Sequence, residues 1–400
     1  MPRSTNETSL TRAEVRSTAA IATIYMARLL GLFMIYPVFA HFAGELQGAT
    51  PRSIGLALGV YGLTQGLLQI PYGLLSDRVG RRTMVVIGLA VFCIGSLIAA
   101  FSSSIWGVFA GRALQGAGAI GSVLLASVAD VTRPETRTRA MAIVGVSIGF
   151  SFMIAVVLGP AVAMVAGMSG IFGLTAILAL GGMAIAAVVI PKRETHVAGV
   201  GIARTKISEL LTDRRLLELD VAIFIQHATM TAMFLAVPAI VSKSMSLAGG
   251  REWMLYLPVL VLAAGLMVPF VISAEKHGRM TAVRFQSIAL IGLSELVLLL
   301  LGGSAIAVVA ALIAYFTAFT VLEAILPSAL TKAAPPSAKG TASGLYSSSQ
   351  FLGIFAGGTL GGFAMGHGGT TAVLAMVLAL TVFWGLIQLL MMSESERRTT

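Results

Sequence analysis

The chain has 400 residues, of which 57% are hydrophobic and only 11% are charged, and its mean hydropathy is +0.92. Soluble domains carry about 25% charged residues, so this composition excludes an ordinary soluble protein and indicates one embedded in a lipid bilayer. The net charge of +10 would suit nucleic acid, but its distribution along the chain has a simpler cause, and we expect no nucleic-acid partner.

Successive apolar stretches are long enough to cross the hydrocarbon core as helices, which takes about 20 residues. We therefore predict an all-α membrane protein with twelve transmembrane helices. The first follows a polar tail and is too long for a signal-peptide core, so we expect it to be retained. The predicted helices cover residues 19–43, 54–75, 83–100, 105–129, 139–166, 170–190, 217–242, 253–273, 281–301, 305–330, 340–365 and 370–391.

Basic residues are divided unevenly between the two sets of loops. Of the 27 Lys and Arg, 22 fall in the tails and in the loops after every second helix, whereas three fall in the opposite loops. Because cytoplasmic loops carry the excess of Lys and Arg, we predict that both termini face the cytoplasm.

The widest polar gap separates six predicted helices from six. The expected parts are a cytoplasmic tail at 1–18, a six-helix bundle at 19–190, a cytoplasmic linker at 191–216, a second bundle at 217–391 and a cytoplasmic tail at 392–400.

Several kinds of site have no sequence signal. Cys93 is the only cysteine and lies within a predicted helix, so neither an internal disulfide nor a CxxC metal site can form. No Walker-type phosphate loop and no nucleophile–base pair is present, so we expect no ATP-driven transport, no enzyme activity, no metal and no cofactor.

The two halves of the sequence resemble each other. The segment "PYGLLSDRVGRR" at 71–82 and the segment "PFVISAEKHGRM" at 269–280 share the spacing of Pro, an acidic residue and Gly-Arg. Two parallel six-helix repeats, related by an axis along the membrane normal, form the major facilitator fold, with a substrate path between the halves. Two halves in one chain also remove the need for a dimer, so we expect a monomer.

Four motifs carry a resemblance to a known family. The segment "GLLSDRVGRR" resembles the loop 2–3 signature of the major facilitator superfamily, and "GRALQGAGAI" at 111–120 resembles its fourth-helix motif. The segments "GVSIGFSFMIAVVLGP" at 145–160 and "RLLGLFMIYPVF" at 28–39 resemble the fifth and first helices of the twelve-helix drug:proton antiporter branch. The resemblance implies a transporter in a bacterial inner membrane. One member of this branch has an extra cytoplasmic domain after the last helix; this chain ends at Thr400, so we expect that domain's function to be absent.

The loop between the second and third predicted helices contains an acidic residue in an electrostatically unfavourable position. Asp77 lies at a helix C-terminus, where the macrodipole disfavours an anion by about 0.3–1 kcal/mol. Gly73, one turn earlier, leaves room for another backbone, and the resemblance implies that this neighbour is helix 11. Arg81 could bridge Asp77 to Asp130. We predict that these four residues form a cytoplasmic gate; the alternative is that the arginines of this loop only enforce topology.

Charges within the membrane cost about 2.5–3.5 kcal/mol each and therefore indicate function. Glu323 stands near the middle of helix 10, and we predict that it carries the coupled proton; the alternative is a permanently protonated core residue. Glu295 lies on a peripheral helix, where a structural or snorkelling role is expected.

Two arginines also lie within predicted helices. Arg112 stays charged and, beside Gln115, can bias a neighbouring acid; the resemblance implies a role in proton coupling, and helix bracing is the alternative. Arg28 lies in the first helix and either lines the cavity or snorkels.

The fifth helix contains a small-residue motif. Gly145, Gly149, Gly159 and Pro160 would let this helix pack tightly and bend. The residues after Pro160 depart from the family pattern, which leaves the direction of transport open.

The predicted cavity has a largely apolar and aromatic lining, which suits hydrophobic or amphipathic small molecules better than sugars. We therefore predict a secondary transporter that exports such compounds in exchange for protons. A metabolite facilitator or symporter of the same fold is the first alternative, and a transport-inactive sensor is the second. The candidate lining residues are Arg28, Tyr36, Gln226, Met230, Phe234, Tyr256, Tyr315, Phe319, Tyr346 and Gln350.

Overall fold

The computed structural model describes residues 10–133, 135–190, 207–247, 251–335 and 338–391. The described ranges leave out residues 1–9 of the predicted N-terminal tail, the whole predicted C-terminal tail and most of the predicted linker. Within these ranges the regular structure is helical, apart from one isolated bridge between Gln47 and Ser104.

The helices form two consecutive sets. The first set, called the N half, comprises α1 (Arg12–Phe33), α2 (Tyr36–Ala43), α3 (Pro51–Val79), α4 (Arg81–Phe101), α5 (Ile105–Ala117), α6 (Gly121–Asp130) and α7 (Arg137–Val189). The second set, called the C half, comprises α8 (Ile207–Thr212), α9 (Arg214–Met245), α10 (Trp253–Lys276), α11 (Met280–Leu301), α12 (Ala305–Ala333) and α13 (Lys339–Met391).

Within the described residues, ten helical segments are long and apolar enough to cross a membrane. Two of them, α7 and α13, each consist of two helices joined at a kink. The kinks are at Gly167, with φ 63°, and at Gly368 and Gly369, the latter with φ 61°. Positive φ is accessible to glycine at little cost, so the chain reverses direction there. Divided at these glycines, the ten segments become twelve; that all twelve cross a membrane stays a prediction.

Local sequence explains where several helices begin and break. The Thr50 side chain accepts a hydrogen bond from the Ser53 amide and Pro51 stands in the first turn, which together start α3. Pro37 lacks a backbone N–H, and the helix is interrupted just before it, between α1 and α2.

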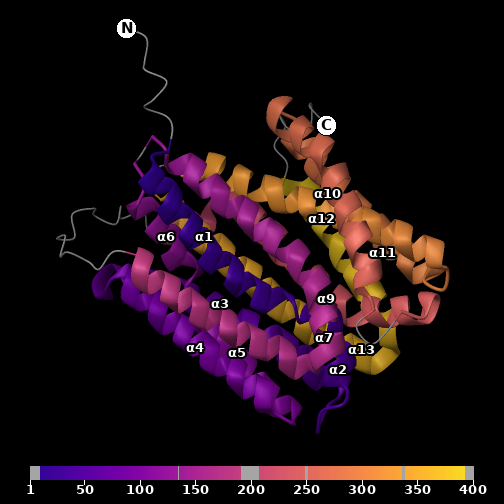
Figure 1. The fold of residues 1–400 in the computed structure, drawn as a ribbon. Helices are drawn as coiled ribbons and strands as arrows, with labels where there is room; N and C mark the ends of the chain where they lie inside the picture. Colours follow the sequence, from indigo (N-terminus) through magenta and orange to yellow (C-terminus); the bar gives the residue numbers. More distant parts are fainter. Residues whose placement is uncertain (1–9, 134, 191–206, 248–250, 336–337, 392–400) are drawn as a thin grey trace.

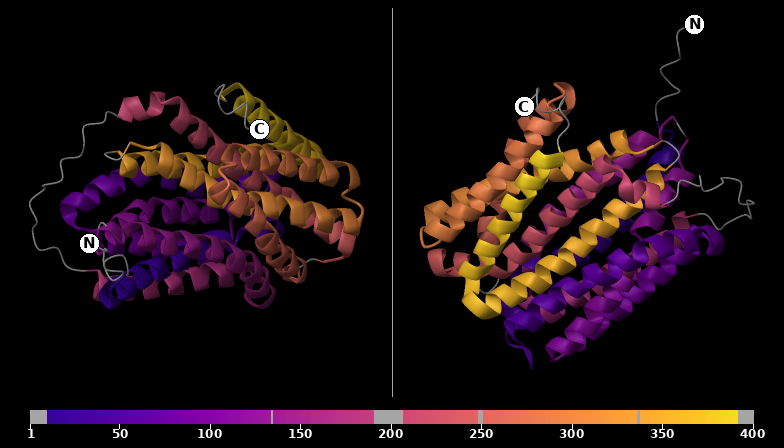
Figure 2. Two further views of the ribbon diagram at one scale, coloured as in Figure 1. Left: turned by 90° about the horizontal axis from the view of Figure 1, so that it is seen from above. Right: turned by 180° about the vertical axis from the view of Figure 1, so that it is seen from behind.

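The two halves lie side by side as bundles, indigo to magenta for the N half and salmon to yellow for the C half (Figures 1 and 2). The most extensive contact between the halves joins α3 to α13. In addition, α2 contacts α9 and α7 contacts α10. The most enclosed of the ten spans is α9, so it lies at the centre of the molecule.

The α3–α13 contact is close at one end of the molecule only. A Cβ atom built on Gly55, Gly59 or Gly62 would collide with the α13 backbone. Further along α3, at Gly73, the nearest atoms belong instead to Ser122 of α6. We call the end near residues 44–51 the closed end, and the end near residues 73–82 the open end.

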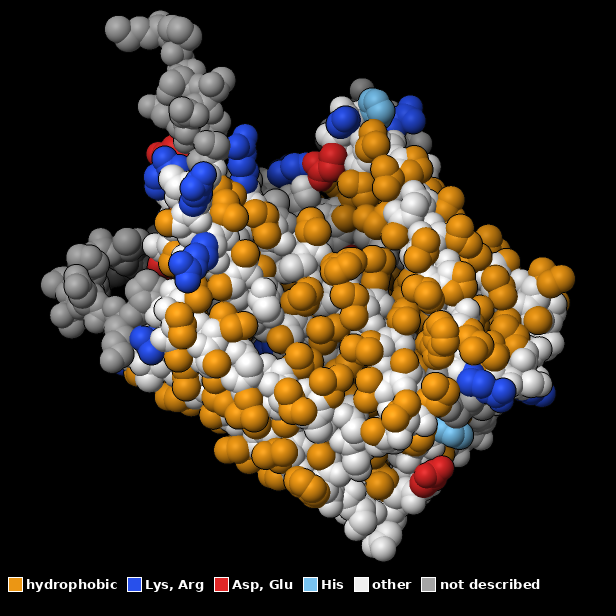
Figure 3. All heavy atoms as spheres, viewed as in Figure 1, with side chains coloured by type: hydrophobic (Ala, Val, Ile, Leu, Met, Phe, Trp, Pro, Cys, Tyr) orange, Lys and Arg blue, Asp and Glu red, His pale blue; other side chains and the backbone are white. Residues whose placement is uncertain are grey.

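The type of side chain on the surface also differs between the flank and the open end. Hydrophobic side chains cover the flank, whereas Lys and Arg gather mainly at the end near both termini, which is the open end (Figure 3). Exposed residues such as Val165, Val188 and Ile306 belong to this flank, as a lipid-facing surface requires.

Candidate functional site

The centre of the C half contains a polar cluster built around Glu323, which we call the Glu323 cluster. The amide nitrogen of Gln226 donates to Glu323 Oε1 at 2.9 Å, and His227 Nε2 lies 3.6 Å from the same oxygen. Gln350 of α13 lies 2.8 Å from His227 Nε2. Three helices, α9, α12 and α13, thus hold one carboxyl group.

The hydrogen bonds of His227 define its tautomer. Its Nδ1 lies 3.2 Å from the carbonyl oxygen of Ile223, which can only accept a hydrogen bond. Nδ1 therefore carries the proton, and Nε2 accepts from the Gln350 amide. The imidazole is buried, whereas the Glu323 side chain keeps 27% of its surface exposed. Glu323 is therefore the more exposed member of the pair, whereas the one unprotonated nitrogen of His227 already accepts from Gln350.

Aromatic rings close the space next to Glu323. Phe319 lies one turn before Glu323 on α12, toward the closed end, and its ring centroid is 5.5 Å from that of Phe152 of α7. Tyr36 and Phe234 make a second contact between the halves, with centroids 5.6 Å apart. These rings, with Phe33, Tyr315 and Phe316, form what we call the aromatic cluster.

The N half carries positive charge at its centre. The Arg112 side chain donates to Gln115 Oε1 at 3.2 Å and to the Leu58 carbonyl at 3.3 Å, and Gln115 donates to Ser96. Its guanidinium lies 4.9 Å from the ring centroid of Tyr61.

Arg28 contacts the same Tyr61 ring from a distance of 5.9 Å and bonds to Gln65. Both Arg28 and Arg112 are buried within the bundle, so a snorkelling Arg28 is excluded. The described residues give neither arginine a carboxylate partner, so their charge is spread over amides, a carbonyl and the rings of Tyr61 and Phe92.

The residues of the predicted gate lie together at the open end. Arg81 Nη1 is 2.6 Å from Asp77, and its Nε is 3.0 Å from Asp130. Within the described part of the chain, Asp77 and Arg81 bond to no residue of α13. The expectation that Gly73 packs against helix 11 is wrong for this structure, because Ser122 of α6 is its neighbour.

The second copy of this motif is arranged differently. Glu275 Oε2 bonds to Lys332 Nζ at 2.7 Å, which joins α10 to α12 inside the C half. Each half therefore ties its own helices together at the open end.

The glycines of the fifth helix have different surroundings. Gly159 lies against the backbone of Met34, which follows α1, so a side chain there would collide, and Pro160 comes next within the helix. Gly145 and Gly149 are exposed, and no described atom lies within 4 Å of the position of an added Cβ. The prediction that they pack tightly is therefore wrong for this structure.

Most of the candidate lining residues are buried rather than open to a cavity. Only Gln350 among them is half-buried; the other nine, from Arg28 to Tyr346, are buried. Of the aromatic residues in the set, Tyr36, Phe234 and Phe319 make ring contacts between the halves. They can line a cavity only after the halves move apart.

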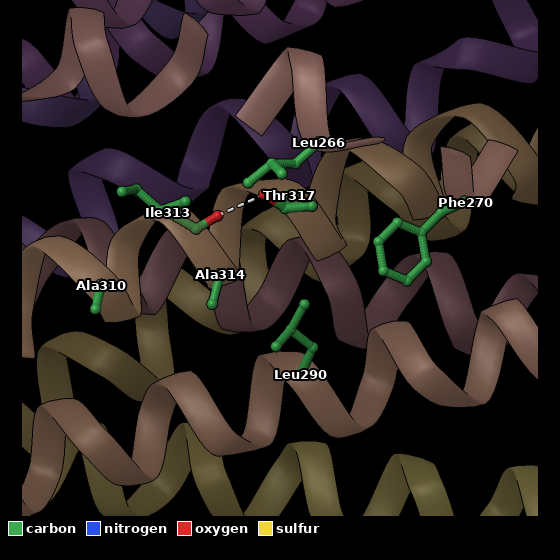
Figure 4. A pocket seen from close by; sticks show the side chains of 7 residues that line it. All are labelled: Leu266, Phe270, Leu290, Ala310, Ile313, Ala314 and Thr317. Atoms are coloured by element: carbon green, nitrogen blue, oxygen red, sulfur yellow. Dashed lines mark hydrogen bonds between the residues drawn. The ribbon is translucent and has the colours of Figure 1, made fainter. Parts of the chain in front are cut away.

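A separate apolar pocket of about 390 Å³ opens on the flank between α10, α11 and α12 (Figure 4). Its walls are Leu266, Phe270, Leu290 and residues of α12. Thr317 is its only polar side chain, and the hydroxyl donates to the Ile313 carbonyl at 2.7 Å. The pocket therefore offers no polar recognition and is distinct from the Glu323 cluster.

Several polar residues were missed or misjudged by sequence reasoning. Glu295 is completely buried, which excludes a snorkelling role. Glu14 is also buried and bonds to Arg133 and Thr136, fastening the start of α1 to the segment between α6 and α7. Its position after Thr11 forms a capping box, a signal that the sequence contains. No periodicity within one helix reveals the His227–Glu323 contact.

Comparisons with known proteins agree with the geometry. A family model described as Major Facilitator Superfamily matches residues 21–358. The chain is 41% identical over 363 residues to the inner membrane transport protein YajR of Escherichia coli strain K12, covering 90% of this chain and 80% of that one. Over 146 residues, 36% of each chain, it is 30% identical to the class B tetracycline resistance protein of Escherichia coli.

A solved structure has a similar arrangement of helices. A bacterial homolog of the human lysosomal transporter Spinster, in an inward-facing and occupied conformation, is 13% identical and has a TM-score of 0.77, over 98% of both chains. At this identity the likeness shows the fold alone.

Proposed function

This chain belongs to the major facilitator superfamily of membrane transporters, and from that premise we propose that it exports small hydrophobic or amphipathic compounds in exchange for protons. As a member of this family it is an integral, multi-pass membrane protein that acts on small-molecule substrates, and not an enzyme. We place it in the bacterial inner membrane, as YajR is, with both termini cytoplasmic and as a monomer.

The observation that carries the proposal is the surroundings of Glu323. A carboxyl group in the membrane interior, half-enclosed by Gln226 and His227, can be neutral or charged according to what its neighbours and water offer. One elementary charge moved through 100 mV is worth about 2.3 kcal/mol, so one such carrier can drive export.

The substrate class follows from the lining. The aromatic cluster adjoins Glu323 and supplies apolar contact area, which favours amphipathic molecules over sugars. The local likeness to a tetracycline resistance protein is in keeping with this class. With the positive-inside orientation, the open end faces the cytoplasm, from which an exporter takes its substrate.

The alternating-access cycle requires contacts that form and break at each end. In this conformation Arg81 holds Asp77 and Asp130 within the N half. We propose that closure brings the start of α13 against this cluster, where the positive end of the helix dipole stabilises Asp77. Gly73 then supplies the room for α13 that it leaves unused in this conformation.

The test uses purified protein in liposomes that contain a pH-sensitive dye, with rhodamine 6G as a lipophilic probe. A probe gradient should move protons, and Glu323→Gln should reduce that movement to the background of empty liposomes while probe binding persists. Glu295→Gln, a change to another buried carboxyl of the C half, is the matched control and should keep coupling. Probe transport without proton movement in the wild type would favour the facilitator alternative.

A further inference from the structure

A second carboxyl group lies near the Glu323 cluster and is not used by the proposed mechanism. Asp220 of α9 is 7% exposed, and its Oδ1 has no hydrogen-bond partner in the described part of the chain. A carboxyl group so placed is costly unless it can exchange its proton or gain a partner during the cycle.

The cations near Asp220 are engaged elsewhere. Arg284 of α11 bonds to Glu218 at 2.6 Å, and Gln388 bonds to the same carboxylate. Arg214 donates to the carbonyl oxygen of Leu390 at 2.6 Å. Asp220 is two residues from Glu218 and so does not share the face of α9 that makes this contact, and it has no ion pair among the described residues.

Helix geometry places Asp220 on the same side of α9 as the Glu323 cluster. It precedes His227 by seven residues, which is two turns and about 10 Å along the axis toward the open end. On α13, Tyr346 precedes Gln350 by four residues and so lies one turn from it in the same direction. Gln350 itself contacts His227.

Tyr346 belongs to the contact between α9 and α13. Tyr346 precedes Gly353 by two turns on α13, and Asp220 precedes Phe224 by one turn on α9, so both lie where these two helices face each other. The buried hydroxyl of Tyr346 makes no hydrogen bond among the described residues. The backbones of α9 and α13 touch at Gly353 and Phe224, which fixes the relative positions of these side chains. A hydroxyl group can accept one proton while donating another, so it can connect two carboxyl groups.

From this juxtaposition we propose that Asp220 and Tyr346 form a proton path that connects Glu323 with the open end. The Glu323 carboxylic acid passes its proton to the Tyr346 oxygen through water. The tyrosine hydroxyl passes its own proton to the Asp220 carboxylate, and Asp220 releases it to water. The tyrosine begins and ends neutral. The inference rests on the proposed role of Glu323.

Such a path would allow Glu323 to release its proton while substrate is bound, which an antiporter requires. A substrate bound against the aromatic cluster and Glu323 covers the exposed part of that carboxyl group, so its proton can no longer leave through the cavity. A path along α9 and α13 lets the proton leave while the substrate stays bound.

The experiment mixes purified protein with rhodamine 6G in weakly buffered detergent solution and follows proton release with a pH indicator in a stopped-flow instrument. At a probe concentration that saturates each variant, Asp220→Asn and Tyr346→Phe should slow release about 100-fold, the scale of one positioned proton-transfer group. Asp220→Glu should recover the rate. The matched controls are Glu209→Gln on α8 and Tyr72→Phe in the N half, both expected to release protons at the wild-type rate.

The outcomes separate the two proposals. Wild-type release rates in both Asp220→Asn and Tyr346→Phe would overturn the path and leave the role of Glu323 intact. Absence of proton release in the wild type, or wild-type release by Glu323→Gln, would overturn the coupling proposal and the path with it. Loss of probe binding in Asp220→Asn that Asp220→Glu does not restore would assign Asp220 a structural role instead.

Discussion

The two ends of the contact between α3 and α13 are built on different physical principles. At the closed end, Gly55, Gly59 and Gly62 bring the α3 backbone against that of α13, so van der Waals contact joins the halves. At the open end, the last turn of α3 contains Asp77, whose partner belongs to its own half.

This difference shows how one helix pair can hold a closed and an open end at once. Backbone contact at small residues is continuous and needs no charged partner, whereas a charged cluster forms a contact only when its partner arrives. In this structure the glycines of α3 contact α13, whereas the Asp77 cluster makes no contact with it. Changes at each end should therefore affect the two conformations in opposite directions.

The largest effect is expected from Gly62→Leu. A side chain there would collide with the Phe351 carbonyl, and backbone cannot give way as a flexible side chain can. Overpacking of this kind costs about 1–3 kcal/mol, which should separate the halves at the closed end and reduce transport of a lipophilic probe. The measurement is a double electron–electron resonance distance between labels at Glu45 and Gly303.

The matched control is Gly145→Leu, because Gly145 is exposed and has no described atom within 4 Å of an added Cβ. It should leave the distances unchanged. Cys93 is the only cysteine and is buried, so label sites are added to a Cys93→Ala background. An unchanged closed-end distance in Gly62→Leu would contradict the glycine contact as the element that holds this end shut.

A smaller effect is expected from Asp77→Asn. Removing this charge takes away the attraction to the helix dipole of α13 in the proposed closed conformation, worth about 0.3–1 kcal/mol. The population should shift toward the open conformation, so distances between labels at Thr83 and His277 should lengthen on average.

Glu275→Gln is the comparison for Asp77→Asn, since Glu275 occupies the matching position and bonds to Lys332 within its own half. Removing that half-exposed pair should change the same distance distribution less. Equal shifts for the two variants would mean that the open end responds to any lost charge rather than to a contact at Asp77.

Composition and periodicity were sufficient for the fold but not for the packing between helices. Apolar segments of membrane-spanning length predict helices because backbone polar groups in lipid must bond within their own segment. The kinks at Gly167 and Gly369 fall between predicted segments, at or near their ends. The sequence places Glu323 within a helix, but the approach of His227 and Gln350 depends on the relative rotation of α9, α12 and α13, which no single helix specifies.

The misplaced predictions share one cause. The neighbour assigned to Gly73 belongs to the other half, and the packing assigned to Gly145 needs an adjacent helix; neither neighbour is in place here. A sequence has to satisfy both conformations of a transporter, whereas one structure shows only one. We therefore expect the glycines at the open end to be used in the proposed closed conformation.

The smallest effect is expected at the closed end's exposed charged contact. The Arg52 guanidinium lies 3.2 Å from His367 and 5.0 Å from the ring centroid of Phe363, so it joins the start of α3 to the end of the first helix of α13. An exposed cation–π contact is worth about 0.5–1 kcal/mol. Arg52→Gln should therefore raise the minor population with a long Glu45–Gly303 distance only a few-fold.

Lys243→Gln removes an exposed basic residue near the same end without touching this contact, so it should leave the distance distribution unchanged. The comparison with Gly62→Leu is decisive for how the closed end is held. If Arg52→Gln opened the closed end as far as Gly62→Leu, the charged contact would hold it, and both ends would work by the same principle. A small effect of Arg52→Gln and a large effect of Gly62→Leu would mean that backbone packing keeps the closed end shut. An exposed charged contact contributes little because water can replace either partner at little cost.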